Sequence, residues 1–464
     1  MNYTIIDFTF LGILFCIFYL ARKSYRPYIL TLSGLFYCFW KSHYTMLYIL
    51  VLTAVLYGIS LLLQKLKDSQ QQTKAKIVLL IGIAVLLSQF IILKESLLPN
   101  TIYIIGLSFF SFQMVSYLVD IYQNRTTAER NICYLLLTMV WFPKLNSGPV
   151  EKVQNLTSQI KALPNFTLFK DDRLYKSLIY IIYGFFCKLV LADRIALYVN
   201  PVFSNIGEVG APWLILASIL YTLQIYFDFA GYSNIAIGVS KLFGIELTQN
   251  FKTPYFAENI SDFWSRWHIS LSNWLKEYIY IPLGGNRKGE TRKYINLMLV
   301  FLLCGFWHGK GLSFILWGAL HGVYSCLNSA LKKHNIKILT SGWTGRLITF
   351  VEVSAAWIFF RADTLKDGLR YIYRILTKWS LEYTLEAQQS LVGTEIWTTW
   401  IIIIGIILIS IFEYIAYHNH KTPCEYLSSL GEVKKSIIIY ILVITMVVLG
   451  IYGNDVTQFI YMQF

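Results

Sequence analysis

Long apolar runs constrain the fold of this chain more than any other feature of its sequence. A helix needs roughly 20 apolar residues to span a bilayer, and several runs approach or reach that length. With the shorter runs included, we expect about 11 to 13 transmembrane or re-entrant helices in an all-α, polytopic membrane protein. The long runs are residues 5–20, 45–63, 77–93, 101–119, 174–191, 213–227, 312–327, 400–417 and 436–451, and the shorter ones are residues 28–40, 132–141, 295–307 and 347–360.

The composition argues against a water-soluble fold and against nucleic-acid binding. Of the 464 residues, 56% are apolar and 14% are charged, whereas soluble domains carry roughly 25% charged residues. The formal net charge of +14 comes from lysines and arginines in the connections between apolar runs, which is the pattern of cytoplasmic loops. We therefore expect membrane lipid and no nucleic acid around the chain, with both termini on the outer side.

One membrane domain over residues 1–464 is the simplest organisation, because no internal repeat or low-complexity linker is present. The first apolar run lacks a basic segment before it and a cleavage site after it, so we interpret it as a retained helix. Two stretches, residues 143–176 and 250–293, do not span. Residues 261–280 predict a helix with one apolar face, which is typical of the membrane interface. Residues 370–379 are a second candidate of this kind.

Neither a metal site nor a disulfide is expected from this sequence. Cys304 and His308 are four residues apart, yet no acidic ligand or zinc-type spacing completes the set. The seven cysteines are scattered, mostly inside apolar runs and without a Cys-x-x-Cys pair. We interpret them as small core residues.

Two histidines within apolar segments are the first candidates for chemistry, because ionisable groups inside a membrane are costly. His308 lies at the turn between two apolar runs, and His321 follows within the second run. Glycines one helical turn apart lie beside each histidine, so that another backbone or a substrate chain can approach closely. Alternatively, the glycines serve helix packing and the histidines are hydrogen-bonded core residues. The glycines stand at positions 305, 309, 318 and 322.

A third histidine, His268, lies near the apolar stripe of the expected interfacial helix. Taken alone, it could be a structural residue that anchors the helix. Other polar residues within apolar runs are expected to pair with one another or to lie at helix ends, and Asp228 is the deepest of them by sequence and could line a cavity. The others are Gln113, Asp120, Lys188, Asp193, Arg194, Gln224 and Arg361.

Several blocks of sequence together resemble the membrane-bound O-acyltransferase family. The blocks are residues 224–238, residues 263–285 and the segment Gly-Phe-Trp-His-Gly at residues 305–309 with residues 317–322. The likeness is greatest to the bacterial branch of alginate and peptidoglycan O-acetyltransferase membrane subunits. It covers roughly residues 100–330, together with a C-terminal tail over residues 459–464.

The resemblance implies a catalytic role for His308. It also implies helices around a central tunnel, through which an acyl group from a cytoplasmic thioester reaches an acceptor on the far side. An imidazole can take a proton from a hydroxyl near neutral pH, which is typically worth about 10² to 10⁴ in rate. His268 and His321 would support this base or line the tunnel.

The aromatic tail, residues 459–464, resembles the C-terminal signature of the same branch. This likeness implies that Tyr461 accepts the acyl group and relays it to an extracytoplasmic esterase-like partner. The alternative is an aromatic anchor at the membrane interface.

A basic segment after the expected interfacial helix could contact the phosphates of CoA, although membrane topology alone would also explain its charge. Its residues are Arg287, Lys288, Arg292 and Lys293.

The sequence therefore predicts a multi-pass O-acetyltransferase of the bacterial plasma (inner) membrane. It would take acetyl from acetyl-CoA, used as a substrate and not as a bound cofactor, and pass it toward an extracytoplasmic polysaccharide. One alternative is transfer of D-alanyl or another acyl group to a cell-wall polymer. The other is a non-catalytic carrier in which the histidines relay protons.

Overall fold

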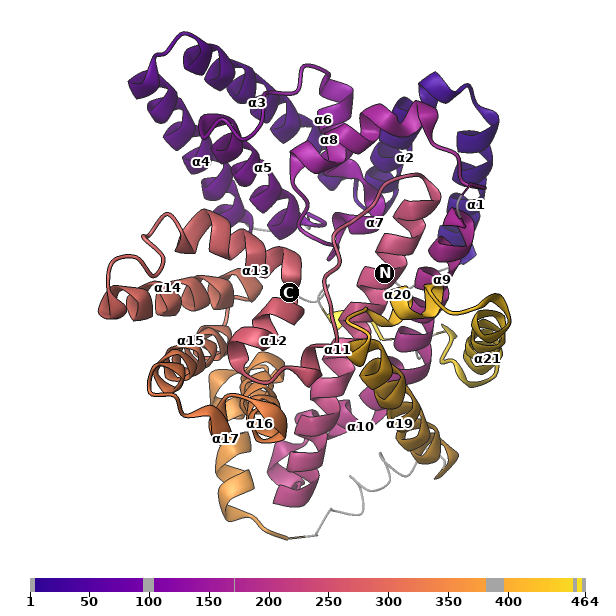
Figure 1. Ribbon diagram of the computed structural model, residues 1–464, viewed down its shortest axis with the longest axis vertical. Helices are drawn as coiled ribbons and strands as arrows, with labels where there is room; N and C mark the ends of the chain where they lie inside the picture. Colours follow the sequence, from indigo (N-terminus) through magenta and orange to yellow (C-terminus); the bar gives the residue numbers. More distant parts are fainter. Residues whose placement is uncertain (1–4, 95–103, 171, 381–395, 454–456, 461–464) are drawn as a thin grey trace. The chain divides into compact units, whose positions relative to one another are not determined.

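The computed structural model describes residues 5–94, 104–170, 172–380, 396–453 and 457–460, and within these ranges the chain forms helices and no β-strand (Figure 1). The all-α fold expected from the sequence is confirmed. The chain divides into two compact units. Unit 1 comprises residues 1–178 and 236–248, and unit 2 comprises residues 179–235 and 249–464. That the two make up one membrane domain stays a prediction.

Unit 1 is built from the N-terminal helices. Helices α3, α4 and α5 pack side by side, and α2 packs against both α3 and α6 (Figure 1). Close packing of α2 on α6 requires a glycine, since a Cβ atom at Gly34 would lie 2.5 Å from the carbonyl oxygen of Val140. The helices are α1 (Ile5–Leu20), α2 (Arg26–Lys41), α3 (His43–Asp68), α4 (Gln72–Lys94), α5 (Leu107–Tyr122), α6 (Ile132–Val140), α7 (Phe142–Leu145), α8 (Val153–Ala162) and the start of α9 (Arg173–Phe186).

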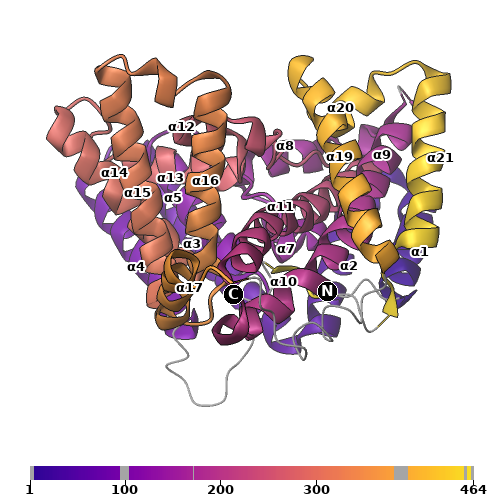
Figure 2. The same ribbon diagram turned by 90° about the horizontal axis from the view of Figure 1, so that it is seen from below.

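Unit 2 contains the three candidate histidines. Helices α14, α15 and α16 lie side by side in it, and α12 packs against α15 (Figure 2). Its elements are the end of α9, the π-helical segment η3 (Cys187–Ala192), α10 (Asp193–Ser204), most of α11 (Ala211–Leu242), α12 (Ile260–Arg266), α13 (Ile269–Leu275), the π-helical segment η6 (Lys276–Tyr280), α14 (Glu290–His308), α15 (Leu312–Lys333), α16 (Gly342–Arg361), α17 (Leu365–Thr377), α19 (Ile396–His418), α20 (Pro423–Ser428) and α21 (Glu432–Leu449).

Three of the described helices are each long and apolar enough to cross a bilayer. They cover His43–Asp68, Ala211–Leu242 and Trp397–His418, and the shorter apolar helix Asp7–Leu20 accompanies them. A membrane protein is therefore confirmed by helix length and composition. The larger number of about 11 to 13 spanning or re-entrant helices stays a prediction.

The prediction of one interfacial helix over residues 261–280 is wrong, because the helix breaks at His268. This residue has φ +44° and ψ 52°, so α12 ends before it and α13 begins after it. Asn250 stabilises the new start: its carbonyl oxygen accepts from the N–H of Ile269, and its side-chain oxygen accepts from the hydroxyl of Ser270 at 2.7 Å. A hydrogen-bonding partner distant in sequence thus overrides the local helical pattern.

The second interfacial candidate is a helix, although it begins earlier than expected. Helix α17 starts at Leu365 because the side chain of Thr364 accepts a hydrogen bond from the N–H of Asp367, which is a typical N-cap. Leu369 and Leu376 are exposed while Tyr371 is buried. The helix therefore presents apolar side chains outward, as expected at a membrane interface.

Helices α14 and α15 pack at very short range through two of the glycines noted in the sequence. A Cβ atom at Gly305 would lie 2.3 Å from the carbonyl oxygen of Phe314, and one at Gly318 would lie 2.3 Å from the carbonyl oxygen of Phe301. Both clashes involve backbone, which cannot move aside cheaply. These two glycines therefore serve helix packing.

We expect Gly305→Ala and Gly318→Ala each to lower the free energy of unfolding by about 1–3 kcal/mol, as is usual for overpacking. Thermal unfolding in detergent measures the effect as a lower Tm. Gly58→Ala is the matched control, because a Cβ atom there meets nothing within 4 Å and alanine favours a helix over glycine. Equal Tm values for all three variants would contradict this account of the α14–α15 contact.

Candidate functional site

His308 is the last residue of α14 and is 4% exposed. Its ring centroid lies 4.7 Å from that of Trp307, 5.0 Å from that of Trp317 and 5.3 Å from that of Phe360, each in an edge-to-face arrangement. The C-terminal end of the helix thus holds the imidazole within a layer of aromatic side chains. Such a layer restricts access of bulk water to the imidazole.

His321 lies on α15, is fully buried and has one ring nitrogen engaged. The indole N–H of Trp264 donates to its Nδ1 at 3.3 Å. A neutral imidazole with an accepting Nδ1 carries its proton on Nε2. Among the residues that the structure describes, this Nε2 has no hydrogen-bond partner, and neither does the indole nitrogen of Trp317 one helical turn earlier. Two buried donors therefore occupy one face of α15.

His268 is also fully buried, at the break between α12 and α13. Its ring centroid lies 4.8 Å from that of Phe229 on α11 and 6.2 Å from that of Trp307. The positive φ at this residue, together with the Asn250 hydrogen bonds to the residues that follow, sets the direction of the side chain.

The three histidines belong to one continuous set of rings, which we call the imidazole–indole cluster and define as His268, Trp307, His308, Trp317 and His321. Trp307 contacts both His268 and His308. Trp317 contacts both His308 and His321, with centroid distances of 5.0 and 4.9 Å. The structure thus brings together all three histidines noted in the sequence, within unit 2 alone.

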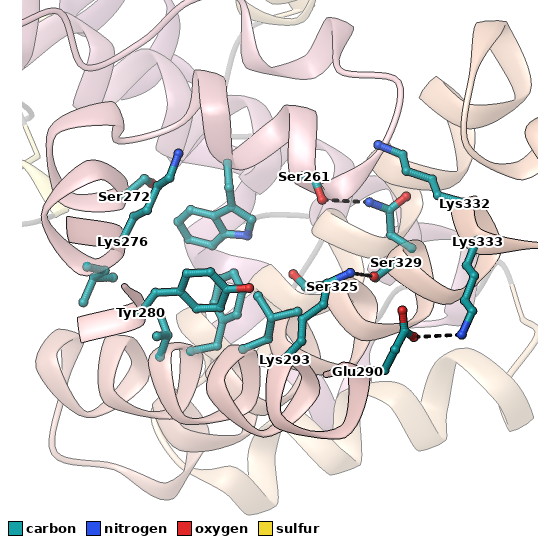
Figure 3. A pocket seen from close by; sticks show the side chains of 16 residues that line it. Ser261, Ser272, Lys276, Tyr280, Glu290, Lys293, Ser325, Ser329, Lys332 and Lys333 are labelled. Atoms are coloured by element: carbon teal, nitrogen blue, oxygen red, sulfur yellow. Dashed lines mark hydrogen bonds and ion pairs between the residues drawn. The ribbon is translucent and has the colours of Figure 1, made fainter. Parts of the chain in front are cut away.

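A cavity of about 620 Å³ lies beside this cluster in the same unit (Figure 3). Two of its wall residues also touch His321: Trp264 donates the hydrogen bond described above, and the ring of Phe301 lies 6.1 Å from the imidazole. A single layer of side chains therefore separates the cavity from His321. The lining residues are Ser261, Trp264, Ser272, Leu275, Lys276, Tyr280, Glu290, Lys293, Leu297, Val300, Phe301, Ser325, Asn328, Ser329, Lys332 and Lys333.

The polar part of this cavity is strongly basic, with four lysines and one acidic residue in its lining. Figure 3 shows Lys293 on α14 bonded to Ser329 on α15, and Glu290 paired with Lys333 at 3.4 Å. The hydrogen bond from Tyr294, with a smaller contribution from Lys333, lowers the pKa of Glu290. Glu290 therefore neutralises one lysine, and the remaining positive charge favours an anionic ligand.

Of the four basic residues proposed from the sequence for CoA phosphates, Lys293 lines this cavity. Arg287, Lys288 and Arg292 are outside its lining, although they lie close in sequence. Sequence reasoning missed Lys276, Lys332 and Lys333. The basic segment after the run at residues 312–327 was the available signal for the last two, but it was interpreted only as a topology marker.

Tyr461 lies outside the described residues. The residues just before it in the tail, Phe459 and Ile460, are described and are buried.

Comparison with known proteins agrees with the resemblance noted in the sequence. The model of the membrane-bound O-acyltransferase (MBOAT) family matches residues 36–362. The chain is 35% identical over 383 residues to the probable alginate O-acetylase AlgI of Pseudomonas fluorescens, covering 81% of this chain and 75% of that protein.

Other relatives carry different acceptors in their names. The peptidoglycan O-acetyltransferase of Helicobacter pylori is 38% identical over 58% of this chain and 56% of its own length. The teichoic acid D-alanyltransferase of Bacillus subtilis is 28% identical over 56% of this chain and 69% of its own length. With a family match over most of its length and a buried histidine cluster inside the matched region, the chain belongs to the membrane-bound O-acyltransferase family and is a membrane O-acyltransferase.

Proposed function

We propose that this protein takes acetyl from acetyl-CoA at the cytoplasmic side of the bacterial plasma membrane, which it crosses several times, and passes it toward an extracytoplasmic polysaccharide. The imidazole–indole cluster is the observation that carries the proposal, because it offers a proton acceptor among buried aromatic rings. Acetyl is the favoured group, since relatives named for alginate or peptidoglycan acetylation are more similar to this chain than those named for D-alanyl transfer.

His308 acts as the general base in this proposal. It takes the proton from an acceptor hydroxyl as that oxygen attacks the thioester carbonyl carbon. The tetrahedral intermediate then collapses, the carbon–sulfur bond breaks, and the proton on His308 passes to the departing CoA sulfur. Acetyl ends on the hydroxyl oxygen and CoA leaves as the free thiol, so His308 returns to its starting state.

Trp317 and His321 stabilise the charge that develops on the carbonyl oxygen. Each has a buried N–H that no described residue accepts from, and buried donors are normally hydrogen-bonded in native proteins. An oxyanion is the acceptor that the reaction creates, and one such donor can contribute about 10² to 10³ in rate. The surrounding rings also exclude water, which would otherwise hydrolyse the thioester.

The lysine-lined cavity receives the phosphate-bearing part of CoA. Its cations match the charge of the phosphates, and Trp264 and Phe301 form the wall nearest His321. A passage from this cavity past Trp264 to His308 is part of the proposal. The hydroxyl that first receives acetyl is that of Tyr461, from which a separate extracytoplasmic esterase-like protein moves it to the polysaccharide.

We expect the double substitution Lys293→Ala and Lys332→Ala to raise the KM for acetyl-CoA about three- to tenfold and to leave kcat nearly unchanged. Partly exposed ion pairs contribute about 0.2–1 kcal/mol each, and this contact does not change as the acetyl group moves. Steady-state kinetics in detergent measures the effect. Arg287→Ala with Lys288→Ala is the matched control, because it removes the same charge outside the cavity lining. Equal KM values in the two double variants would reject this site for CoA.

Purified protein in liposomes, supplied with acetyl-CoA labelled in the acetyl group, tests the function as a whole. The expected result is label on the protein and, with the partner and polysaccharide present, on the polymer. Movement of label or glycan across the bilayer with no acyl bond formed would favour the carrier alternative. Labelling from a D-alanyl thioester but not from acetyl-CoA would favour the other enzymatic alternative.

A further inference from the structure

A buried group of three charged side chains lies in unit 2. Lys188, in the π-helical segment η3, places its ammonium nitrogen 2.8 Å from Oδ1 of Asp193 and 2.8 Å from Oδ1 of Asp228. All three residues are at most 3% exposed. Buried charges are expensive unless they are paired and hydrogen-bonded, so this arrangement needs a structural or functional reason.

Two glycines bring the lysine and Asp228 together. A Cβ atom at Gly184 on α9 would lie 2.7 Å from the carbonyl oxygen of Gly231 on α11, and one at Gly231 would lie 2.9 Å from that of Gly184. The helices can therefore approach at backbone distance, one turn from Lys188 on one side and from Asp228 on the other. The π-helical register of η3 accompanies this contact, and π-bulges are frequent at functional sites.

The partners that complete the group come from the C-terminal tail. The carbonyl oxygen of Thr457 accepts from Lys188 Nζ at 2.8 Å, and its hydroxyl donates to Oδ1 of Asp193. The tail thus supplies both an acceptor to the cation and a donor to one carboxylate.

The next residues of the tail bind the other carboxylate and cover the cation. The N–H of Ile460 donates to Oδ2 of Asp228 at 2.8 Å. The ring centroid of Phe459 lies 4.5 Å from Lys188 Nζ, within the range of a cation–π contact, and 5.2 Å from the ring of Tyr232. Phe459 and Ile460 are both buried.

The charges show why the tail and this group depend on each other. One ammonium group cannot neutralise two carboxylates, and the remaining negative charge is met by the hydroxyl of Thr457 and the N–H of Ile460. If the tail were removed, Asp228 and Asp193 would each lose a hydrogen bond, and leaving a buried charged group unsatisfied is costly. The group is therefore better satisfied with the tail in place than without it.

We propose that Lys188, Asp193 and Asp228 form a clasp that holds residues 457–460 so that Tyr461, the next residue in the chain, is presented for acyl transfer. The clasp residues are positioning residues and not catalytic ones. This inference rests on the proposed relay through Tyr461. It adds a reason for ionised residues between α9, α10 and α11 that no step of the acyl chemistry uses.

Lys188→Met tests the clasp, because methionine keeps much of the lysine volume and removes the charge. Digestion by a carboxypeptidase, followed by intact mass measurement, reports how firmly the tail is held. We expect trimming of the wild type to stop before Thr457, and trimming of the variant to pass Thr457 at least tenfold faster. Lys366→Met, at an exposed position on α17, is the control and should resemble the wild type. Trimming of all three proteins to the same residue at the same rate would overturn the clasp.

Thr457→Val provides a second test that leaves the three charged residues intact, in case Lys188→Met does not fold. It removes the hydroxyl that donates to Asp193, and a smaller increase in trimming rate is expected. For both variants we also expect the kcat for acetyl transfer to fall about tenfold or more, with the KM for acetyl-CoA and the Tm unchanged. Faster trimming with wild-type kcat would overturn the positioning role. If Tyr461→Phe itself retained full transfer, the relay would fail, while the trimming result would still report on the clasp.

Discussion

Replacement of His308 by alanine is expected to reduce acetyl transfer from acetyl-CoA by about 10² to 10⁴-fold, which is the usual contribution of a general base. The reason is local: the attacking hydroxyl loses the group that accepts its proton, and the edge-on rings of Trp307, Trp317 and Phe360 offer no substitute base. The fall should be in kcat, since the lysine-lined cavity is unchanged. Release of CoA thiol in detergent measures it.

Two controls separate loss of the base from loss of structure. His334→Ala removes a histidine at an exposed position after α15 and should leave the rate within about twofold of the wild type. His308→Gln keeps more of the side-chain volume within the cluster but cannot replace imidazole as a base near neutral pH, so it should be as inactive as the alanine variant with a Tm closer to that of the wild type. An active His308→Gln protein would exclude a base at this position.

Tyr461→Phe is expected to abolish transfer to the polysaccharide, with a residual rate below about 1% of the wild type, because a covalent relay needs the phenolic oxygen and phenylalanine lacks it. The KM for acetyl-CoA should be unchanged. Acetyl content of the polysaccharide after incubation with the partner protein measures the effect.

The matched control for the relay is Tyr452→Phe, which removes a phenol at an exposed position in the same C-terminal region. Normal polysaccharide acetylation is expected for this variant. Unchanged acetylation in the Tyr461→Phe protein would show that the tail serves as an aromatic anchor, and the acceptor hydroxyl would then have to lie elsewhere.

Much of the fold could be predicted because hydrophobic periodicity and length are local properties of the sequence. The apolar runs at residues 312–327 and 400–417 correspond to α15 and α19. The break at His268 could not be predicted, because it depends on hydrogen bonds from Asn250 in a different part of the chain. Local pattern identified the amphipathic stretch, and tertiary contacts decided where its helices end.

The candidate histidines could be recognised as unusual polar residues in apolar surroundings, and the structure gathers them into one cluster. The indole groups that join them are tertiary contacts, which a single sequence does not reveal: the hydrogen bond from Trp264 to His321 connects residues 57 positions apart. The same holds for Lys276, which lines the cavity beside Lys293.

The clasp shows a similar division between what is local and what is not. Pairing among Lys188, Asp193 and Asp228 was expected, because buried charges seek opposite charges. The participation of Thr457 and Ile460 was not, since these residues lie more than 200 positions away in the sequence. A polar residue in an apolar run indicates that a partner exists, but not which one.

A single-turnover labelling experiment tests most directly whether His308 moves acetyl from a thioester to a hydroxyl. Protein is mixed with acetyl-CoA carrying an isotopic acetyl group, quenched within seconds, and the C-terminal peptide, residues 436–464, is sequenced by mass spectrometry. The account predicts acetyl on Tyr461 in the wild type and in His334→Ala, and none in His308→Ala. Label on Tyr461 in the His308→Ala protein at the wild-type rate would contradict it.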